Sequence, residues 1–348
     1  MQHDSRQVES AGLIAARLRK ALHAIGHPGA ALPLVPLADK GLAHVHMRLA
    51  GTGLLARIPK QSQLGLPPAQ ALAYEAACFR SAAASERTPR LHGVLPPSED
   101  LPRGALLVDE VVGRPLALPG ELPAMARCLA ALHALPVPPA DARPPVLEPA
   151  DALAVLLQEI AQQAVHLDAG RHPEAARAAR GGLDALQALA ARTARPEVRL
   201  IAFDAHPGNF LLDAQGRAWL VDLEKCRYAY PGLDLAHATL YTSTTWDLGS
   251  STTLGKDEVL DFYGAWEAAV DAQLAAAARP WHAPLRLAMW LWSLSWCAKW
   301  QALSAREPDA GLQGEDWSAD HSDAALVAHV RERVAHYLDA RTVAQVQA

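Results

Sequence analysis

The stretch 201-IAFDAHPGNFLLDAQGRAWLVDLEK-225 constrains the fold of this chain more than any other. Two hydrophobic runs, FLLD and AWLVDL, flank the tetrapeptide AQGR, which predicts a β-hairpin with Gly216 in its turn. Asp204 and Asn209 precede the hairpin, and Asp222 ends its second strand. Because a hairpin brings its two ends together, we expect the Asp222 carboxylate beside Asn209. The alternative is ordinary turn chemistry around the Pro-Gly pair.

The spacing of these side chains is typical of phosphoryl transfer. Asp204 and Asn209 show the Asp-x4-Asn spacing of a kinase catalytic loop, in which the Asp takes the proton of the acceptor hydroxyl. Asn209 and Asp222 would supply oxygen ligands to Mg²⁺, an ion that keeps several waters and needs few protein ligands. The pattern therefore predicts a kinase that uses ATP and Mg²⁺.

The rest of the chain divides into a strand-rich part and a helical part. Period-2 patterns predict four strands, at residues 44–50, 54–60, 91–95 and 105–113. Helices are expected in the same part at 5–25 and 68–85. After Gly113 the helical period predominates, with expected helices at 121–135, 150–166, 172–194, 257–277, 283–304 and 323–340. We expect an α+β fold, with a small antiparallel-sheet lobe over 1–112 and a mainly helical lobe over 113–348.

Composition narrows the classes of partner. The 32 basic and 37 acidic residues give a net charge of −5, which argues against a nucleic-acid binder. The four cysteines lie far apart without a CxxC pair, as expected of buried thiols in a reducing compartment. No leader segment and no run of 18 apolar residues is visible, so no membrane span is expected. We expect a cytoplasmic protein, a monomer or homodimer, that acts on a small molecule.

The segment FDAHPGNFLLDAQGRAWLVDLEKCRYAYPGLDLAH resembles the aminoglycoside phosphotransferase/choline kinase superfamily, which is related to the protein kinases. The resemblance implies a protein-kinase-like two-lobed fold, with Asp204 as the catalytic base and Asn209 and Asp222 as metal ligands. Asp234 matches a structural Asp of the next helix, a position that a plain helix N-cap would also explain. The family's His two positions before the base is Ala202 here. That departure leaves a non-catalytic, nucleotide-binding scaffold as an alternative.

Weaker matches upstream imply a nucleotide site. KGLAHVHMRLAGTGLLARIPK resembles the family's nucleotide-covering hairpin, where Gly41 would give the backbone room over the phosphates. Arg57 matches the phosphate-binding cation of the family, and Glu75 matches the acidic partner of that cation. Ala43-His44 replaces the usual Ser/Thr-Asn, so backbone N–H groups would have to bind phosphate there. The residues expected near the adenine are Val108, Asp109, Glu110 and Val111.

Aromatic residues late in the chain are candidates for the acceptor site. Trp292, Trp296 and Trp300 recur at every fourth position of MWLWSLSWCAKW, so they share one face of a helix. Such a stripe is ordinary core packing in most helices, but aromatic clusters also bind ammonium groups. The segment resembles the Trp-rich late helix of choline and ethanolamine kinases. Further candidates for the acceptor site are Glu224, Trp246 and Asp247.

The loop 307–323 contains six acidic residues and no Lys or Arg. It is either a solvated loop or an acidic rim that attracts a positively charged acceptor. We therefore predict that the acceptor is a small cationic hydroxyl compound of the amino-alcohol, choline-like type. An aminoglycoside is the alternative.

Overall fold

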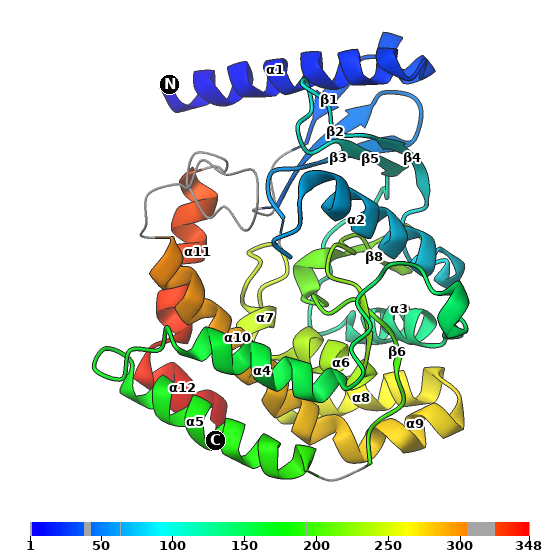
Figure 1. Cartoon of the computed structure of the whole chain (residues 1–348). Coiled ribbons are helices and arrows are strands. Elements are labelled where there is room, and N and C mark those ends of the chain that lie inside the picture. The colour runs from blue at the N-terminus through cyan, green and yellow to red at the C-terminus, as the bar shows by residue number, and fades with distance from the viewer. Residues whose placement is uncertain (1, 38–42, 63, 192–193, 305–323, 348) are drawn as a thin grey trace. The chain divides into compact units, whose positions relative to one another are not determined.

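The computed structural model describes the whole chain except residues 1, 38–42, 63, 192–193, 305–323 and 348, which Figure 1 draws in grey. Side chains are described from residue 12 onward. The described residues form two compact units. Of the described residues, the first unit contains those within 2–83 and 89–110 and a short segment at 324–327, and the second contains those within 84–88, 111–304 and 328–347. The first unit carries an antiparallel sheet and the second is mainly helical, so the predicted α+β class is confirmed.

The sheet of the first unit has five antiparallel strands in the order β1–β2–β3–β5–β4. Their bounds are β1 (Leu34–Pro36), β2 (His44–Leu49), β3 (Leu54–Pro59), β4 (Leu91–Leu95) and β5 (Ala105–Asp109). β2 and β3 form the predicted hairpin around the GTG turn. The three-residue edge strand β1 was not expected from the sequence. It contains Pro36, a residue that sheets tolerate at an edge.

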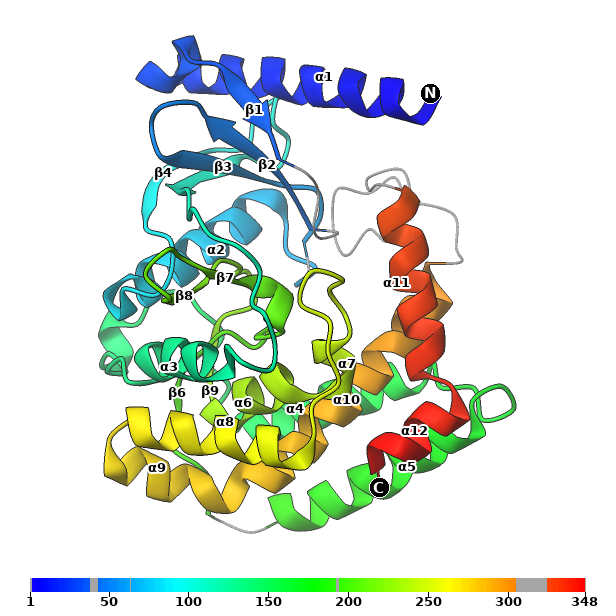
Figure 2. The same ribbon diagram turned by 180° about the vertical axis from the view of Figure 1, so that it is seen from behind.

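One helix covers each face of this sheet, as Figures 1 and 2 show. Leu18 and Leu22 of α1 (Gln2–Ala24) pack in one buried cluster with Met47 of β2 and Ala56 of β3. Side chains alternate between the faces of a strand, so the next residue, Arg57, points to the other face. There its guanidinium lies 5.5 Å from the ring centre of Phe79 in α2 (Pro68–Ala82).

The second unit is built around the long helix α10 (His282–Leu303), which packs against α4, α5 and α6. The other helices are α3 (Leu122–His133), α4 (Ala152–Ala164), α5 (Pro173–Ala190), α6 (Pro231–Thr239), α7 (Tyr241–Thr244), α8 (Lys256–Ala269), α9 (Ala272–Ala278), α11 (Ala324–Tyr337) and α12 (Ala340–Gln347). The sequence predicted one helix over 257–277, and the structure has two. Asp271 begins the second by accepting a hydrogen bond from the N–H of Leu274 at 2.8 Å.

Two short antiparallel pairs frame the predicted catalytic segment. β7 (Phe210–Leu212) and β8 (Ala218–Leu220) form the predicted hairpin, with Phe210 opposite Leu220. β6 (Arg199–Ile201) and β9 (Arg227–Ala229) form a second pair that was not expected. The loops 202–209 and 221–226 are therefore held together at both of their ends. This arrangement brings residues twenty positions apart in the sequence into contact.

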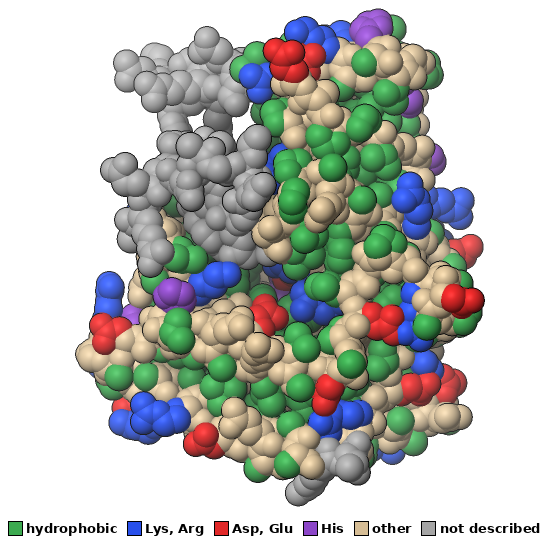
Figure 3. Space-filling model, viewed as in Figure 1, with side chains coloured by type: hydrophobic (Ala, Val, Ile, Leu, Met, Phe, Trp, Pro, Cys, Tyr) green, Lys and Arg blue, Asp and Glu red, His purple; other side chains and the backbone are tan. Residues whose placement is uncertain are grey.

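Charged side chains of both signs are visible on one face of the molecule (Figure 3). On the face shown in Figure 3, Lys and Arg side chains are interspersed with Asp and Glu side chains, in keeping with the near balance of the two signs. Among the described helices, none is long and apolar enough to cross a membrane.

Candidate active site

A fully buried carboxylate fixes the backbone of the loop 202–209. Asp234 of α6 accepts hydrogen bonds from the N–H groups of Ala202 and Phe203, each at 2.7 Å. His133 of α3 contacts the same carboxylate at 3.1 Å through Nε2, and Trp266 of α8 donates to its Nδ1 at 3.0 Å. Since an indole N–H only donates, Nδ1 accepts and Nε2 carries the proton given to Asp234. The network links three helices, α3, α6 and α8, to the loop.

The backbone is strained immediately before the candidate base. Phe203 has a φ of +63°, in the left-handed region that side chains other than Gly rarely adopt. Its ring contacts Trp292 at 5.2 Å between centres and lies 3.5 Å from the guanidinium carbon of Arg227. The two hydrogen bonds to Asp234 and this packing hold the unusual conformation. They set the direction in which the next residue, Asp204, presents its side chain.

Asp204 forms an ion pair inside the second unit. Its Oδ2 accepts a hydrogen bond from Nζ of Lys225 at 2.8 Å, and its Oδ1 lies 3.7 Å from Nδ1 of His237. Burial alone would raise the pKa of Asp204, but the charge and hydrogen bond of Lys225, together with the nearby imidazoles of His206 and His237, outweigh it and hold that pKa well below the usual range. Burial also lowers the pKa of His237, to about 4. At neutral pH the site therefore holds one carboxylate, one ammonium and an uncharged imidazole.

Asp204 lies at the wall of a pocket with four aromatic side chains. The pocket encloses about 500 Å³ of space, part of it open to solvent. Trp292 and Trp296 of α10 line it together with Trp246 and Tyr337. Trp246 meets Trp296 edge to face at 5.7 Å and stacks against Tyr337 at 6.4 Å. The indole N–H of Trp292 donates to Oε1 of Glu159 at 2.8 Å, which fixes the orientation of that ring.

Several polar atoms of this pocket lack a hydrogen-bond partner among the described residues. They are Oγ1 of Thr242, Oγ of Ser243 and the Nδ1 atoms of His206 and His237. Thr242, Ser243 and His237 are at most 7% exposed, so water does not freely solvate them. Buried polar groups are nearly always paired in folded proteins. These four atoms are exceptions to that rule among the described residues.

Asn209 and Asp222 meet at the open end of the β7–β8 hairpin. The backbone carbonyl of Asn209 accepts a hydrogen bond from the N–H of Val221 at 2.9 Å. Asp222 is the residue after Val221, so its backbone lies next to that of Asn209. The amide nitrogen of Asn209 donates to the backbone carbonyl of Asp204 at 2.8 Å. That bond uses the donor side of the amide and leaves its oxygen for another ligand. An amide oxygen and a carboxylate form a donor set that suits Mg²⁺.

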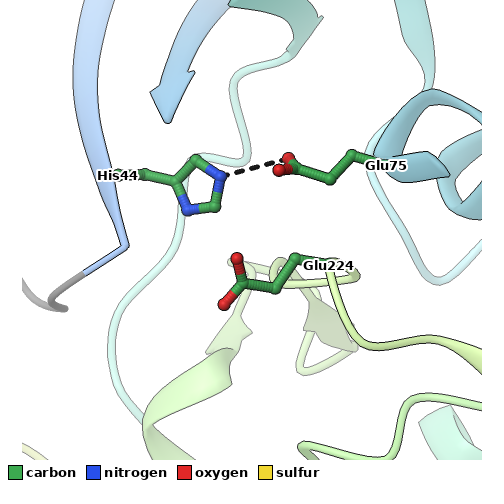
Figure 4. A group of neighbouring side chains, drawn as sticks. All are labelled: His44, Glu75 and Glu224. Carbon is green, nitrogen blue, oxygen red and sulfur yellow. Dashed lines mark hydrogen bonds and ion pairs between the residues drawn. The ribbon is translucent and has the colours of Figure 1, made fainter. Parts of the chain in front are cut away.

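In the first unit, His44 connects the predicted phosphate-binding cation to its predicted acidic partner. Nδ1 of His44 lies 3.3 Å from the guanidinium of Arg57, and its Nε2 lies 3.1 Å from Oε2 of Glu75 (Figure 4). A guanidinium only donates, so Nδ1 is the acceptor and Nε2–H donates to Glu75. All three side chains are buried. Glu224, which Figure 4 also draws, belongs to the second unit.

Residues 44–257, more than half of the chain, match the model of the phosphotransferase enzyme family. The chain belongs to this family. A sequence comparison with curated proteins gives no match for this phosphotransferase.

Solved structures with the same fold include proteins named for different acceptors. A choline/ethanolamine kinase family protein from Mesorhizobium loti has a TM-score of 0.56 and 18% identity, over 96% of this chain and 99% of that chain. A choline kinase from Cryptosporidium parvum has a TM-score of 0.55 and 14% identity, over 97% and 96%. The GDP complex of aminoglycoside 2'-phosphotransferase-IIIa has a TM-score of 0.54 and 16% identity, over 88% and 92%. At these identities the likeness shows the fold, and the predicted protein-kinase-like fold is confirmed.

The residues predicted to lie near the nucleotide of the phosphotransferase differ in their contacts. Val108 is buried in β5, and the carboxylate of Asp109 contacts Nε2 of His92 at 2.6 Å. Glu110 is the last residue of its segment in the first unit, and its carboxylate pairs with Arg48. Val111 begins the next segment of the second unit. Gly41 and the acidic loop predicted as a rim lie outside the described residues.

The predicted acceptor residues divide into two groups. Trp246, Trp292 and Trp296 line the pocket with Asp204. Asp247 instead lies against the catalytic loop, where a Cβ at Gly208 would come within 2.7 Å of its Cβ, and it accepts a hydrogen bond from Ser250 at 3.0 Å. Glu224 is 7% exposed and does not belong to the described lining of the pocket.

Sequence reasoning missed six polar residues of the pocket: Lys225, His206, His237, Thr242, Ser243 and Ser293. His206 lies inside the Asp-x4-Asn motif, where the turn around the Pro-Gly pair would also account for it. The available signal was chemical, because a buried carboxylate needs a nearby cation. Lys225 is the cation at the end of the same motif block.

Proposed function

We propose that this phosphotransferase moves the γ-phosphoryl group of ATP to a hydroxyl group of a small molecule bound in the aromatic pocket. The observation that carries the proposal is the position of Asp204. Its carboxylate reaches the aromatic pocket from a backbone that Asp234 and Asn209 hold in place. Kinase catalysis depends mainly on such positioning and on charge stabilisation.

Asp204 would orient the acceptor and take its proton. Its Oδ2 is occupied by Lys225, and its Oδ1 has no hydrogen-bond donor among the described residues. The acceptor O–H would donate to Oδ1, which aims the oxygen lone pair at phosphorus. As the new O–P bond forms and the bond between the β- and γ-phosphates breaks, the hydroxyl proton passes to Oδ1 and ADP leaves. Lys225 keeps Asp204 ionised before that transfer.

Asn209 and Asp222 would hold the metal of the nucleotide complex. When bound, Mg²⁺ would neutralise charge on the phosphate oxygens. The hairpin keeps the two ligands adjacent through the hydrogen bond between Val221 and Asn209. Arg57 would bind the donor phosphates, and His44 would orient its guanidinium. Nucleotide binding is further supported by GDP in a structure of the same fold.

Two features of the pocket bear on the predicted choline-like acceptor: one favours a cationic acceptor and the other disfavours it. Four aromatic rings favour an ammonium group, and the choline and ethanolamine kinases of the same fold support that class. Lys225, however, already places an ammonium 6.0 Å from the ring centre of Trp292. The aminoglycoside alternative is supported by the aminoglycoside phosphotransferase of the same fold. The proposal therefore specifies a small hydroxyl compound and includes both classes as reference acceptors.

Release of ADP in the presence of a panel of amino alcohols, polyols and aminoglycosides tests the proposal. Asp204→Asn should lower kcat by about 10²–10⁴-fold because it removes the proton acceptor. Binding of ATP with Mg²⁺, followed by thermal unfolding, should stay unchanged in the same variant. Asp184→Asn, at an exposed position of α5, is the matched control. Equal turnover by wild type and Asp204→Asn would refute the catalytic assignment.

The scaffold alternative came from Ala202, which replaces a histidine of the family. In this chain the N–H of Ala202 is bound by Asp234, and that carboxylate is itself contacted by an imidazole, His133. The backbone of the loop is therefore anchored without a histidine at position 202. Binding of ATP without turnover of any acceptor in the panel would favour the scaffold.

A further inference from the structure

Lys225 supplies a cation from within the pocket wall. Its ammonium donates to Oδ2 of Asp204 at 2.8 Å and lies 6.0 Å from the ring centre of Trp292. A carboxylate and an aromatic face are the two groups that would recognise an ammonium-bearing acceptor. Here both are in contact with a side chain of the protein itself. A cationic acceptor would meet a like charge at the point where it has to bind.

Asp204 and Lys225 are the one carboxylate and the one ammonium among the described lining residues of the pocket. Asp204 carries one negative charge, and burial raises the pKa of the thiol of Cys297 to about 12, so this lining residue is uncharged. Burial raises the pKa of Tyr337 further above its usual value, so the phenol is also uncharged. His237 is neutral at pH 7. Among the described lining residues, no second carboxylate remains to compensate an incoming ammonium.

The unpaired polar atoms require a different kind of ligand. Oγ1 of Thr242 and Oγ of Ser243 each can donate one hydrogen bond and accept others, and the Nδ1 atoms of His206 and His237 are two further groups with no hydrogen-bond partner in the described part of the chain. A quaternary ammonium offers no donor to any of them. Hydroxyl groups both donate and accept, so a compound with several hydroxyls satisfies all four atoms. Leaving such buried groups unpaired is costly, and the cost selects for the ligand that pairs them.

We infer that the acceptor is an uncharged compound with several hydroxyl groups, such as a sugar or a cyclic polyol, with Lys225 in the place of an acceptor ammonium. The inference rests on the proposed transfer, because it takes the aromatic pocket as the acceptor site. The C–H face of such a ring packs on the Trp246 and Trp296 indoles, while its hydroxyls face Thr242 and Ser243. One hydroxyl donates to Oδ1 of Asp204 and receives the phosphoryl group.

Matched pairs of ligands test the acceptor class. Each pair consists of an uncharged polyol and its analogue in which an ammonium replaces one hydroxyl. The pairs are glucose with glucosamine, and glycerol with 3-amino-1,2-propanediol. Choline and ethanolamine complete the panel. Binding is measured by the fluorescence of the pocket tryptophans, and turnover by ADP release. In wild type the uncharged member should bind about tenfold tighter or more, because an added cation meets Lys225.

Variants of Lys225 separate its charge from its shape. Lys225→Met removes the charge, so the preference for the uncharged member should disappear or reverse, with amino alcohols gaining affinity for the exposed Asp204 carboxylate. Lys225→Gln is a second neutral variant in case the first does not fold, as judged by circular dichroism. Lys225→Arg should retain the wild-type preference. Lys256→Met, at an exposed position of α8, should also retain it.

The inference is overturned if choline or an ammonium member binds wild type more tightly than the uncharged compounds. It is equally overturned if folded Lys225→Met and Lys225→Gln keep the wild-type ratio, or if no polyol binds at millimolar concentration. Failure of the proposed transfer has a distinct signature. In that case the binding preference persists, and no acceptor in the panel gives release of ADP.

Discussion

Asp234 holds the catalytic loop, and its replacement by Asn tests how strongly it does so. Three donors converge on its two oxygens: the N–H groups of Ala202 and Phe203, and Nε2–H of His133. Asn keeps one acceptor oxygen and presents an NH₂ group in place of the other, so at least one buried donor loses its partner. That loss costs about 1–3 kcal/mol. The other two bonds lose charge assistance, about 1 kcal/mol each, so we expect the free energy of unfolding to fall by about 3–5 kcal/mol.

Urea unfolding followed by circular dichroism measures this change, with Asp184→Asn as the control that removes an exposed carboxylate of α5. The loop should also lose the restraint on the φ of +63° at Phe203, so kcat should fall more than the KM for ATP rises. A loss of stability under about 1 kcal/mol, with kcat unchanged, would show that the network does not hold the loop.

Three further predictions concern the pocket and the metal ligands. Because the pKa of His237 is about 4 in the folded chain and 6.5 in the unfolded one, the unfolded state binds the proton first, and stability falls as the pH drops from 6.5 to 4. In urea titrations at pH 7.5 and 4.5, His237→Asn should lose up to about 3 kcal/mol less of its free energy of unfolding between the two pH values than wild type loses. The same pH dependence in wild type and variant would contradict this. Asp222→Ala should abolish the extra thermal stabilisation that Mg²⁺ adds to ATP and leave metal-free ATP binding unchanged, whereas intact Mg²⁺ dependence would exclude Asp222 as a ligand. Trp296→Leu should raise the acceptor KM by about three- to thirtyfold with little change in kcat, and a lowered kcat at constant KM would instead indicate a role in the transition state.

Local patterns sufficed to predict the elements that carry their own signals. The hairpin around Gly216 was predicted because its hydrophobic runs and turn lie within a dozen residues. The β6–β9 pair was missed because each strand has only three residues, and a partner more than twenty residues away decides their conformation. The break between α8 and α9 had a usable signal in Asp271, a good N-cap residue that was read as helix interior.

The candidate site divides in the same way. The positions of Asp204, Asn209 and Asp222 follow from motif spacing, and the structure places their backbones together, although their catalytic and metal-binding roles remain predictions. Lys225 could not be placed from spacing. Alternation along the strand only shows which face a side chain takes, whereas its contact with Asp204 depends on how two loops meet. The sequence alone predicts a pocket that binds a cation. The structure shows that the ammonium of Lys225 already contacts Asp204 in this pocket.

The hydrogen bond between Val221 and Asn209 makes the spacing of Asn209 and Asp222 independent of the length of the hairpin. The bond lies at the open end of the β7–β8 pair, and the turn with Gly216 lies at the closed end. Adding or removing cross-strand pairs at the turn changes the length of the hairpin without moving Asn209 relative to Asp222. Sequence change in this turn is therefore free to alter solubility or surface contacts while the spacing of the two ligands stays constant. A single-residue insertion within β7 or β8, which shifts the register, would part them.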